Sequence, residues 1–316
     1  MSLVLHSASA AQEGAAGELV AATDRFVFYS RFPLNLHDRL RHTAVVPEAD
    51  SSACLQGLPQ QDREAWEQAV QQYREVFTAQ GARLQRLRVW FTLAGLSEQV
   101  EAELGPVPDE VQQALEAGTA AYRACWWRKD DEANRRWINA LHAMLLEVEE
   151  KVASRLTEAY QTPWKASTIT VDVVPYVSRL GATTADGHIL INSSYEHYQG
   201  RAALEMIFHE ASHTIIGPRA GEPSRQFREA GQRLRVEVPR DLWHVVIFYT
   251  TGEVVRKVIE EKYGEEYLPY VYAGGLFERG TWPAFQEPLE TWWKPYLKRE
   301  IEMAAAAEGL LTALSK

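Results

Sequence analysis

Several features are scarce or missing in this 316-residue sequence, and each absence excludes a class of protein. No apolar run approaches the roughly 18 residues that a membrane-spanning helix needs, so we expect a soluble body without a spanning segment. Basic residues are outnumbered, with 33 Lys and Arg against 43 Asp and Glu, and they form no long run. The formal net charge of −10 therefore argues against a nucleic-acid partner.

Cysteine is scarce as well. The two cysteines, Cys54 and Cys125, lie in no CxxC pair, so they can form one disulfide or remain two buried thiols. Residues 7–11 (SASAA) resemble the cleavage end of a secretory signal, although the apolar stretch before them is too short for one. We expect residues 1–22 to be a disordered tail or a signal remnant, which favours an extracytoplasmic (periplasmic or secreted) location over the cytoplasm.

The composition that is present predicts a globular protein with a large core. Hydrophobic residues make up 46% of the chain, which includes ten Trp, and we find no internal repeat. Residues 23–162 form a mainly helical region, because apolar residues recur at helical spacing over residues 62–80, 83–104, 109–127 and 131–161. Gly81, Gly105-Pro106 and the charged turn Lys129-Asp130 separate these helices. Three histidines here, His37, His42 and His142, are interpreted as structural or exposed.

The pattern changes at Thr162-Pro163, which we take as the start of a second region, residues 163–316. Residues 167–177 (STITVDVVPYV) alternate in the manner of a strand, and residues 180–192 contain Asp186-Gly187, a strong signal for a two-residue hairpin. A small antiparallel sheet is therefore expected, followed by further helices. The fold class is predicted as α+β, mainly α.

The motif that carries chemistry lies in residues 202–217, AALEMIFHEASHTIIG. His209, Glu210 and His213 have the HExxH spacing, which on a helix places both imidazoles on one face, one turn apart. Two neutral imidazoles are good Zn²⁺ ligands, and a carboxylate beside them that does not bind the metal can act as a general base toward water. Apolar residues at helical intervals and the stop signal Gly217-Pro218 favour the helix. The alternative is a pair of hydrogen-bonded core histidines with Glu210 on a solvated edge.

A third metal ligand must come from a later segment. Residues 241–262 predict a nearly apolar helix in which His244 and Glu253 are the ionisable candidates near neutral pH. They lie nine residues apart and hence on opposite faces. We favour Glu253, because a buried carboxylate needs a cation, although Arg256 is an alternative partner. Glu229 is a further candidate, but its arginine neighbours favour a solvated ion-pair face.

The order of strand, hairpin, HExxH helix and later acidic helix resembles the gluzincin group of zinc metallopeptidases over roughly residues 169–260. The resemblance implies that His209 and His213 bind zinc together with a Glu from a later helix, and that Glu210 is the base. It also implies that an edge strand above the cleft pairs with an extended peptide substrate. The acidic helix comes later here than in the commonest gluzincin spacing.

These patterns predict a zinc-dependent hydrolase, a metallopeptidase whose partner is a peptide or protein substrate. A hydrogen-bond donor to the oxyanion is expected among Tyr249, Tyr270, Tyr272 and His244, and the sequence does not choose between them. Two alternatives stay open. One is a catalytically silent protein that keeps a zincin scaffold for binding or structure, and the other is a helical protein whose HEASH is accidental.

Overall fold

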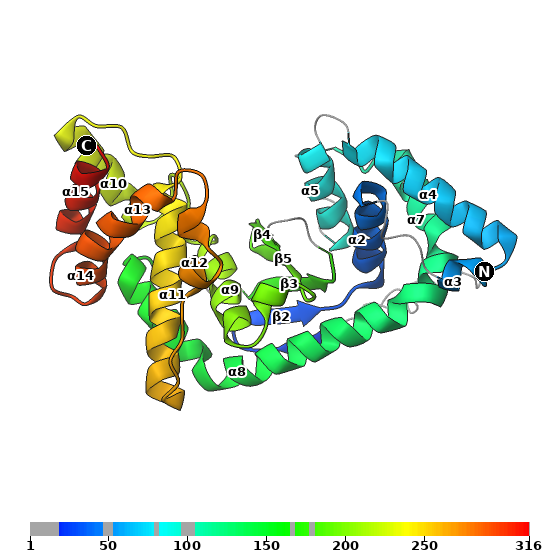
Figure 1. Cartoon of the computed structure of the whole chain (residues 1–316), viewed down its shortest axis with the longest axis horizontal. Helices are drawn as coiled ribbons and strands as arrows, with labels where there is room; N and C mark the ends of the chain where they lie inside the picture. The colour runs from blue at the N-terminus through cyan, green and yellow to red at the C-terminus, as the bar shows by residue number, and fades with distance from the viewer. Residues whose placement is uncertain are drawn as a thin grey trace, which may run out of the picture.

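The computed structural model of the chain describes residues 19–46, 53–78, 82–95, 105–164, 168–176 and 181–315. It confirms the α+β class with a mainly helical content. Two groups of helices lie at the two ends of a long helix, α8 (Arg128–Tyr160), and a small sheet lies between them (Figure 1). Across these ranges, every helix falls short of the combined length and apolar character that a membrane crossing demands.

We call the first group of helices the N-terminal lobe and the second the C-terminal lobe. The N-terminal lobe contains α2 (Phe32–Val45), α3 (Ala53–Gln56), α4 (Gln60–Thr78), α5 (Ala82–Leu93) and α7 (Asp109–Tyr122). The C-terminal lobe contains α9 (Arg201–Ser212), α10 (Glu222–Leu234), α11 (Leu242–Tyr263), α12 (Tyr270–Ala273), α13 (Pro283–Pro288), α14 (Lys294–Leu297) and α15 (Met303–Leu314).

The sheet has the strand order β1-β2-β3-β5-β4. Its strands are β1 (Leu19–Ala22), β2 (Phe26–Tyr29), β3 (Ile169–Val174), β4 (Ala182–Ala185) and β5 (His188–Asn192). The hairpin predicted at Asp186-Gly187 is confirmed, because β4 and β5 pair antiparallel and both turn residues have positive φ, 46° and 75°. The expectation of an antiparallel sheet is wrong for β3, which pairs parallel with both β2 and β5.

The parallel pairing of β2 with β3 has a consequence for the domain division. The connection between these two strands is the whole N-terminal lobe together with α8, since a parallel pair needs a crossover and cannot be joined by a tight turn. The sheet thus takes strands from both sides of the expected boundary at 162/163, and so does its core, which joins Phe26 and Phe28 to buried residues of α8 and α9. Residues 19–22, expected in the tail, form β1, and the rest of that tail lies outside the described residues.

The N-terminal lobe follows the predicted helices with one exception. The expected break at Lys129-Asp130 is absent: α7, the π-helical segment η2 (Arg123–Trp127) and α8 follow one another directly, with helical backbone angles at the junctions. Asp130 lies within this continuous helix and can be buried because its carboxylate accepts two hydrogen bonds from Arg39, each of 3.0 Å. The helix expected over 83–104 ends at Leu93 and is followed by a turn at Ala94–Gly95, and residues 96–104 lie outside the described residues.

A disulfide settles the state of the two cysteines. Cys54 in α3 is bonded to Cys125 in η2, across a sequence separation of 71 residues. The bond ties the short helix α3 to the junction between α7 and α8. It lies in the N-terminal lobe, whereas the HExxH motif belongs to the C-terminal lobe.

Candidate metal centre

The HExxH motif lies on α9, as predicted. Every residue from Ala203 to Ser212 is buried, so α9 runs through the core of the C-terminal lobe and does not lie on its surface. His213 follows at the C-cap, where its backbone N–H donates to the carbonyl oxygen of Glu210 at 3.2 Å. A helix that is buried all round fixes its side chains on every face, which is the rigidity that a ligand site requires.

The two motif histidines face each other. Nε2 of His209 and Nε2 of His213 are 3.3 Å apart, and the two rings are nearly perpendicular at 87°. Two nitrogens that bind one tetrahedral Zn²⁺ at about 2.0 to 2.1 Å are about 3.3 Å apart, so the pair already has the separation that a shared ion requires. Two neutral rings can also share a proton at this distance, and a third residue decides between these interpretations.

That third residue is His244, in the first turn of α11. One ligand atom from each of His209, His213 and His244 lies within 4.8 Å of the others. The ring centroid of His244 is 5.4 Å from that of His209 and 5.1 Å from that of His213. A hydrogen-bonded histidine pair has no need of a third imidazole, whereas three imidazoles around one point are a known set of ligands for catalytic zinc.

Aromatic rings surround this cluster. Phe248, one turn after His244 on α11, stacks on His209 with 3.6 Å between ring centroids. Trp243 contacts the edge of His213, and Trp282 contacts the edge of His244. These rings fix the imidazole orientations and exclude water from one side of the cluster.

Burial keeps all three imidazoles in the neutral form that binds metals. Desolvation lowers the pKa of His213 to about 3 and that of His244 to about 4. Desolvation also holds the pKa of His209 well below its usual value, and the neighbouring His213 and His244 lower it further. The Nδ1 atom of His209 is buried without a hydrogen-bond partner among the described residues. The donor set, its spacing and its protonation state therefore fit a zinc ion.

Glu210 points to the sheet. The hydroxyl of Thr184, on β4, donates to the Oε2 atom of Glu210 and also lies 3.0 Å from its carbonyl oxygen. Glu210 is 6% exposed, and burial raises its pKa to about 7, an effect that the Thr184 hydrogen bond partly offsets. A carboxylate in this environment is suited to accept a proton near neutral pH. The sequence placed Thr184 in a strand but gave no sign that it would touch Glu210.

Glu253, the favoured third ligand in the sequence, lies elsewhere. It accepts a hydrogen bond of 2.7 Å from Arg256 on the same helix, the alternative partner named above. The helix α11 continues through Gly252, so Glu253 stays on the face opposite His244. Gly252 allows close packing between α11 and the segment with Pro269, since a Cβ there would lie 2.6 Å from the Cβ of Pro269. The structure brings His244, and not Glu253, to the histidine pair.

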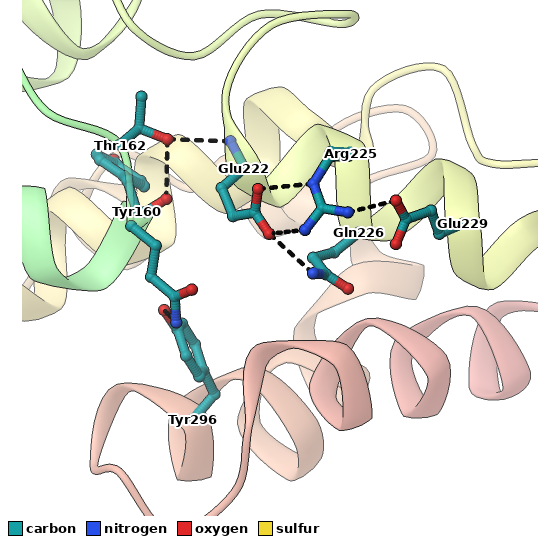
Figure 2. Close-up of polar contacts among 8 residues, drawn as sticks. Tyr160, Thr162, Glu222, Arg225, Gln226, Glu229 and Tyr296 are labelled. Atoms are coloured by element: carbon teal, nitrogen blue, oxygen red, sulfur yellow. Dashed lines mark hydrogen bonds and ion pairs between the residues drawn. The ribbon is translucent and has the colours of Figure 1, made fainter.

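Glu229, the remaining carboxylate candidate, is held on the surface of α10. Figure 2 shows Arg225 between Glu222 and Glu229, with hydrogen bonds to both carboxylates. The start of α10 is fixed to the end of α8, because the N–H of Glu222 donates to the Thr162 hydroxyl at 3.0 Å (Figure 2). Glu229 thus belongs to the solvated ion-pair face expected from its neighbours.

The candidate oxyanion donors divide into two groups. Tyr249 and Tyr272 contact each other, and Tyr272 donates to Glu290. Tyr270 lies on the side of the cluster, with its ring 6.1 Å from that of Phe248 and 5.6 Å from that of Tyr198. Burial raises the pKa of Tyr198, and the neighbouring Tyr270 and Glu210 raise it further, so a second tyrosine lies near the base.

Glu205 is a buried carboxylate that was not among the residues predicted from the sequence. It lies one turn before His209, is fully buried, and accepts hydrogen bonds from the Tyr267 hydroxyl at 2.6 Å and from the Tyr270 backbone N–H at 2.9 Å. Burial raises its pKa to about 7. Glu205 fastens the segment that carries Tyr270 to the motif helix. Its spacing of four residues from His209 was the available signal.

The histidines of the first region have ordinary partners. Nδ1 of His37 lies 3.0 Å from the Tyr73 hydroxyl, the His42 ring stacks on Tyr176, and Nε2 of His142 lies 3.0 Å from the carbonyl oxygen of Ala22. Each has a contact that accounts for its position, in line with the structural interpretation.

Comparison with models of known protein families, with curated proteins and with solved structures gives no match to this chain. The functional assignment therefore depends on the chemistry of the residues themselves.

Proposed function

We propose that the protein is a zinc-dependent metallopeptidase whose metal is held by His209, His213 and His244. The observation that carries this proposal is the convergence of three neutral imidazoles within 4.8 Å, beside a buried glutamate that is not one of them. This set differs from the gluzincin pattern that the sequence resembles, because a histidine replaces the later glutamate.

Glu210 is the proton-transfer group in this proposal. A bound Zn²⁺ supplies Lewis acidity, which polarises a carbonyl oxygen and makes water acidic near neutral pH. Glu210 accepts the proton of the attacking water and then delivers it to the leaving amine. Its hydrogen bond from Thr184 fixes the carboxylate orientation, and burial brings its pKa into the range where both transfers occur.

Tyr270 is our choice for the donor to the oxyanion. It lies beside Phe248, which stacks on His209, whereas Tyr272 donates to Glu290 and the ring of Tyr249 contacts that of Tyr272. Its backbone is fixed by Glu205, which lies on α9 one turn before His209. A donor on such a support is preorganised, and removal of one oxyanion donor typically costs about 10² to 10³ in kcat.

A peptide is the substrate class that the sheet favours. β4 is an edge strand, and it carries Thr184, which touches Glu210. An extended chain can add to such an edge through backbone hydrogen bonds, and this places its carbonyl groups beside the base.

The test is a metal analysis of protein purified without a metal-affinity column, combined with turnover of a mixed peptide library. We expect close to one zinc per chain and cleavage that the Glu210→Gln variant loses while it keeps its zinc. Absence of zinc would identify HEASH as accidental. Stoichiometric zinc without turnover would identify a silent scaffold.

A further inference from the structure

The chain that follows α12 returns to the histidine cluster at Trp282. This segment contains η4 (Leu276–Glu278) and ends at Trp282, whose ring centroid lies 5.7 Å from that of His244 and 5.7 Å from that of Phe248. Its other end is α12, which carries Tyr270 and contacts both α9 and α11 (Figure 1). Both ends of the segment are thus fixed beside the candidate metal centre.

The backbone of Gly274 lies directly against Tyr270. The N–H of Gly274 donates to the carbonyl oxygen of Tyr270 at 2.7 Å, and a Cβ on Gly274 would lie 2.9 Å from Cζ of Tyr270, the ring carbon that bears the hydroxyl. This approach is too close for any residue with a Cβ. The Tyr270 backbone is in turn held by Glu205 on α9. The carbonyl oxygen of Gly274 therefore has a fixed position near the hydroxyl end of the Tyr270 ring.

Arg279 is anchored to that carbonyl oxygen. One of its terminal nitrogens donates to the Gly274 oxygen at 2.6 Å. Arg279 is exposed and, among the residues that the structure describes, pairs with no carboxylate. A guanidinium has five N–H donors in a planar fork, so most of them are available to a ligand. Burial raises the pKa of Tyr270, the neighbouring Tyr195 raises it further, and the positive charge of Arg279 lowers it, which agrees with a guanidinium close to this tyrosine.

Two carboxylates belong to this part of the site, and neither pairs with Arg279. Glu278, its neighbour in sequence, directs its Oε2 atom toward Gly275, where a Cβ would lie 3.4 Å away. Glu205 is fully buried and accepts the hydrogen bond from the Tyr270 backbone. The fork of Arg279 is therefore open to a carboxylate from outside the chain, which it can bind through two parallel charge-assisted hydrogen bonds.

We infer that Arg279 binds a carboxylate of the substrate, beside the candidate oxyanion donor Tyr270. The inference rests on the proposed peptidase function and adds the substrate class, which is a peptide with a carboxylate near the bond that is cleaved. The α-carboxylate of a C-terminal residue and the side chain of an acidic residue both present the same planar anion to the guanidinium. Arg279 is a binding residue in this inference and takes no part in the proton transfers of Glu210.

The first test uses a peptide that the wild-type protein cleaves, prepared in matched forms. One pair ends in a free carboxylate or an amide, and further pairs have Glu or Gln at each position near the cleaved bond. We expect kcat/KM to be about tenfold higher for the charged member of one pair, which corresponds to about 1.4 kcal/mol. The pair that shows this preference identifies the source of the carboxylate. No preference for a charged peptide in any pair overturns the inference and leaves the peptidase assignment intact.

Variants of Arg279 assign the preference to this residue. Arg279→Met should bring the ratio of charged to neutral kcat/KM close to one, and Arg279→Lys, which keeps the positive charge, should retain part of it. Arg233→Met is the matched control, because it removes an arginine of the same lobe that pairs with Glu308 at 3.6 Å, and it should keep the wild-type ratio. Zinc content and melting temperature show that each variant is folded. A wild-type ratio in folded Arg279→Met overturns the inference.

Ionic strength gives a readout on the wild-type protein alone. The preference should weaken as the salt concentration rises, because salt screens an ion pair at an exposed arginine. A preference that salt does not change contradicts an ion pair with Arg279.

Calorimetry with the zinc-loaded Glu210→Gln variant separates this inference from the proposed function, since it measures binding of the matched peptides without turnover. Tighter binding of a charged peptide that Arg279→Met removes, together with cleavage by the wild-type protein, supports the inference. The same binding without cleavage of any peptide by the zinc-loaded wild-type protein contradicts the peptidase proposal, and the carboxylate would then not belong to a substrate. Equal binding of the charged and neutral peptides overturns the role of Arg279.

Discussion

His37 in the N-terminal lobe and His209 in the C-terminal lobe are both buried, and burial lowers the pKa of each. They differ in what faces their ring nitrogens. His37 has a tyrosine hydroxyl at 3.0 Å, which is an ordinary hydrogen-bond partner. His209 has the Nε2 atom of a second imidazole at 3.3 Å and a third imidazole beside it. Burial alone therefore does not mark a metal ligand, and our proposal for His209 depends on the convergence of three imidazoles.

The two lobes also differ in how they are held together. The N-terminal lobe has a disulfide and a buried ion pair between Arg39 and Asp130, whereas the described part of the C-terminal lobe has no disulfide and has the buried carboxylate Glu205 on α9, which accepts hydrogen bonds from neutral donors. Covalent and ionic cross-links stabilise the first lobe, and in our proposal a metal ion does so in the second. Each of the following predictions tests this contrast.

The largest effect is expected on metal binding. His244→Ala should weaken zinc binding by more than about 100-fold, because it removes one of three ligands, whereas Glu253→Ala should leave zinc affinity unchanged. Competition with a chromophoric chelator measures both. A large loss in Glu253→Ala alone would restore the carboxylate that the sequence favoured and remove His244 from the site.

The next effect concerns the base. Glu210→Gln keeps the size of the side chain and can still accept the Thr184 hydrogen bond, but it cannot accept a proton from water. Peptide hydrolysis should fall by about 10² to 10⁴ with zinc retained. Glu253→Gln is the matched control, since Glu253 is a carboxylate that pairs with Arg256 and lies on the face of α11 opposite His244. A similar loss in both variants would mean that Glu210 acts through the fold.

The disulfide should stabilise the first lobe without affecting the metal. Replacing Cys54 and Cys125 by Ser releases a loop of 71 residues, which should lower the free energy of unfolding by about 4 kcal/mol. Urea unfolding of the oxidised wild type and the double variant measures the difference, and zinc content serves as the control. Equal stability of the two proteins would show that the bond adds nothing to the fold.

The smallest effect is a pH dependence in the N-terminal lobe. The folded-state pKa of His37, about 3, lies below its unfolded value of 6.5, so the unfolded chain binds the extra proton between these values. The contribution of the neutral, buried His37 to the free energy of unfolding is complete above pH 6.5 and is lost as the pH falls. By about pH 5 the free energy of unfolding should be about 2 kcal/mol lower than near pH 7.

Urea unfolding near pH 7 and pH 5 checks this against His37→Gln, which keeps a partner for Tyr73 but does not titrate. The metal-site histidines contribute equally to both proteins, so the difference between the two pH slopes isolates His37. Identical slopes would contradict the assignment.

Local patterns in the sequence predicted local structure well. Apolar spacing located α4, α7 and the motif helix, and Asp186-Gly187 located the β4–β5 turn, because these features depend on residues a few positions apart. The pairing of β2 with β3 was not predictable in this way, since the paired residues, such as Phe26 and Ile169, are 143 positions apart in the sequence.

The site was half predictable for the same reason. His209, Glu210 and His213 share one helix, so their spacing sufficed. The positions of His244 and Glu253 depended on which face of α11 meets α9, and it is the face with His244 that lies against the histidine pair. The helix break predicted at Lys129-Asp130 does not occur, because Arg39, which is distant in sequence, neutralises the charge of the buried Asp130.

The π-helical segment η2 affects which face of the continuous helix formed by α7, η2 and α8 points toward α2. Buried residues recur at every fourth position from Gly118 through Tyr122, Trp126 and Asp130 to Asn134, all in contact with α2 or its neighbours. In an ideal α-helix each such step would rotate the stripe by about 40°, and it would leave α2 within two turns. The wider π turn absorbs part of this rotation. Deleting a single residue from 123–127 would turn everything after it by about 100°, so that the apolar face of α8 would no longer meet the sheet.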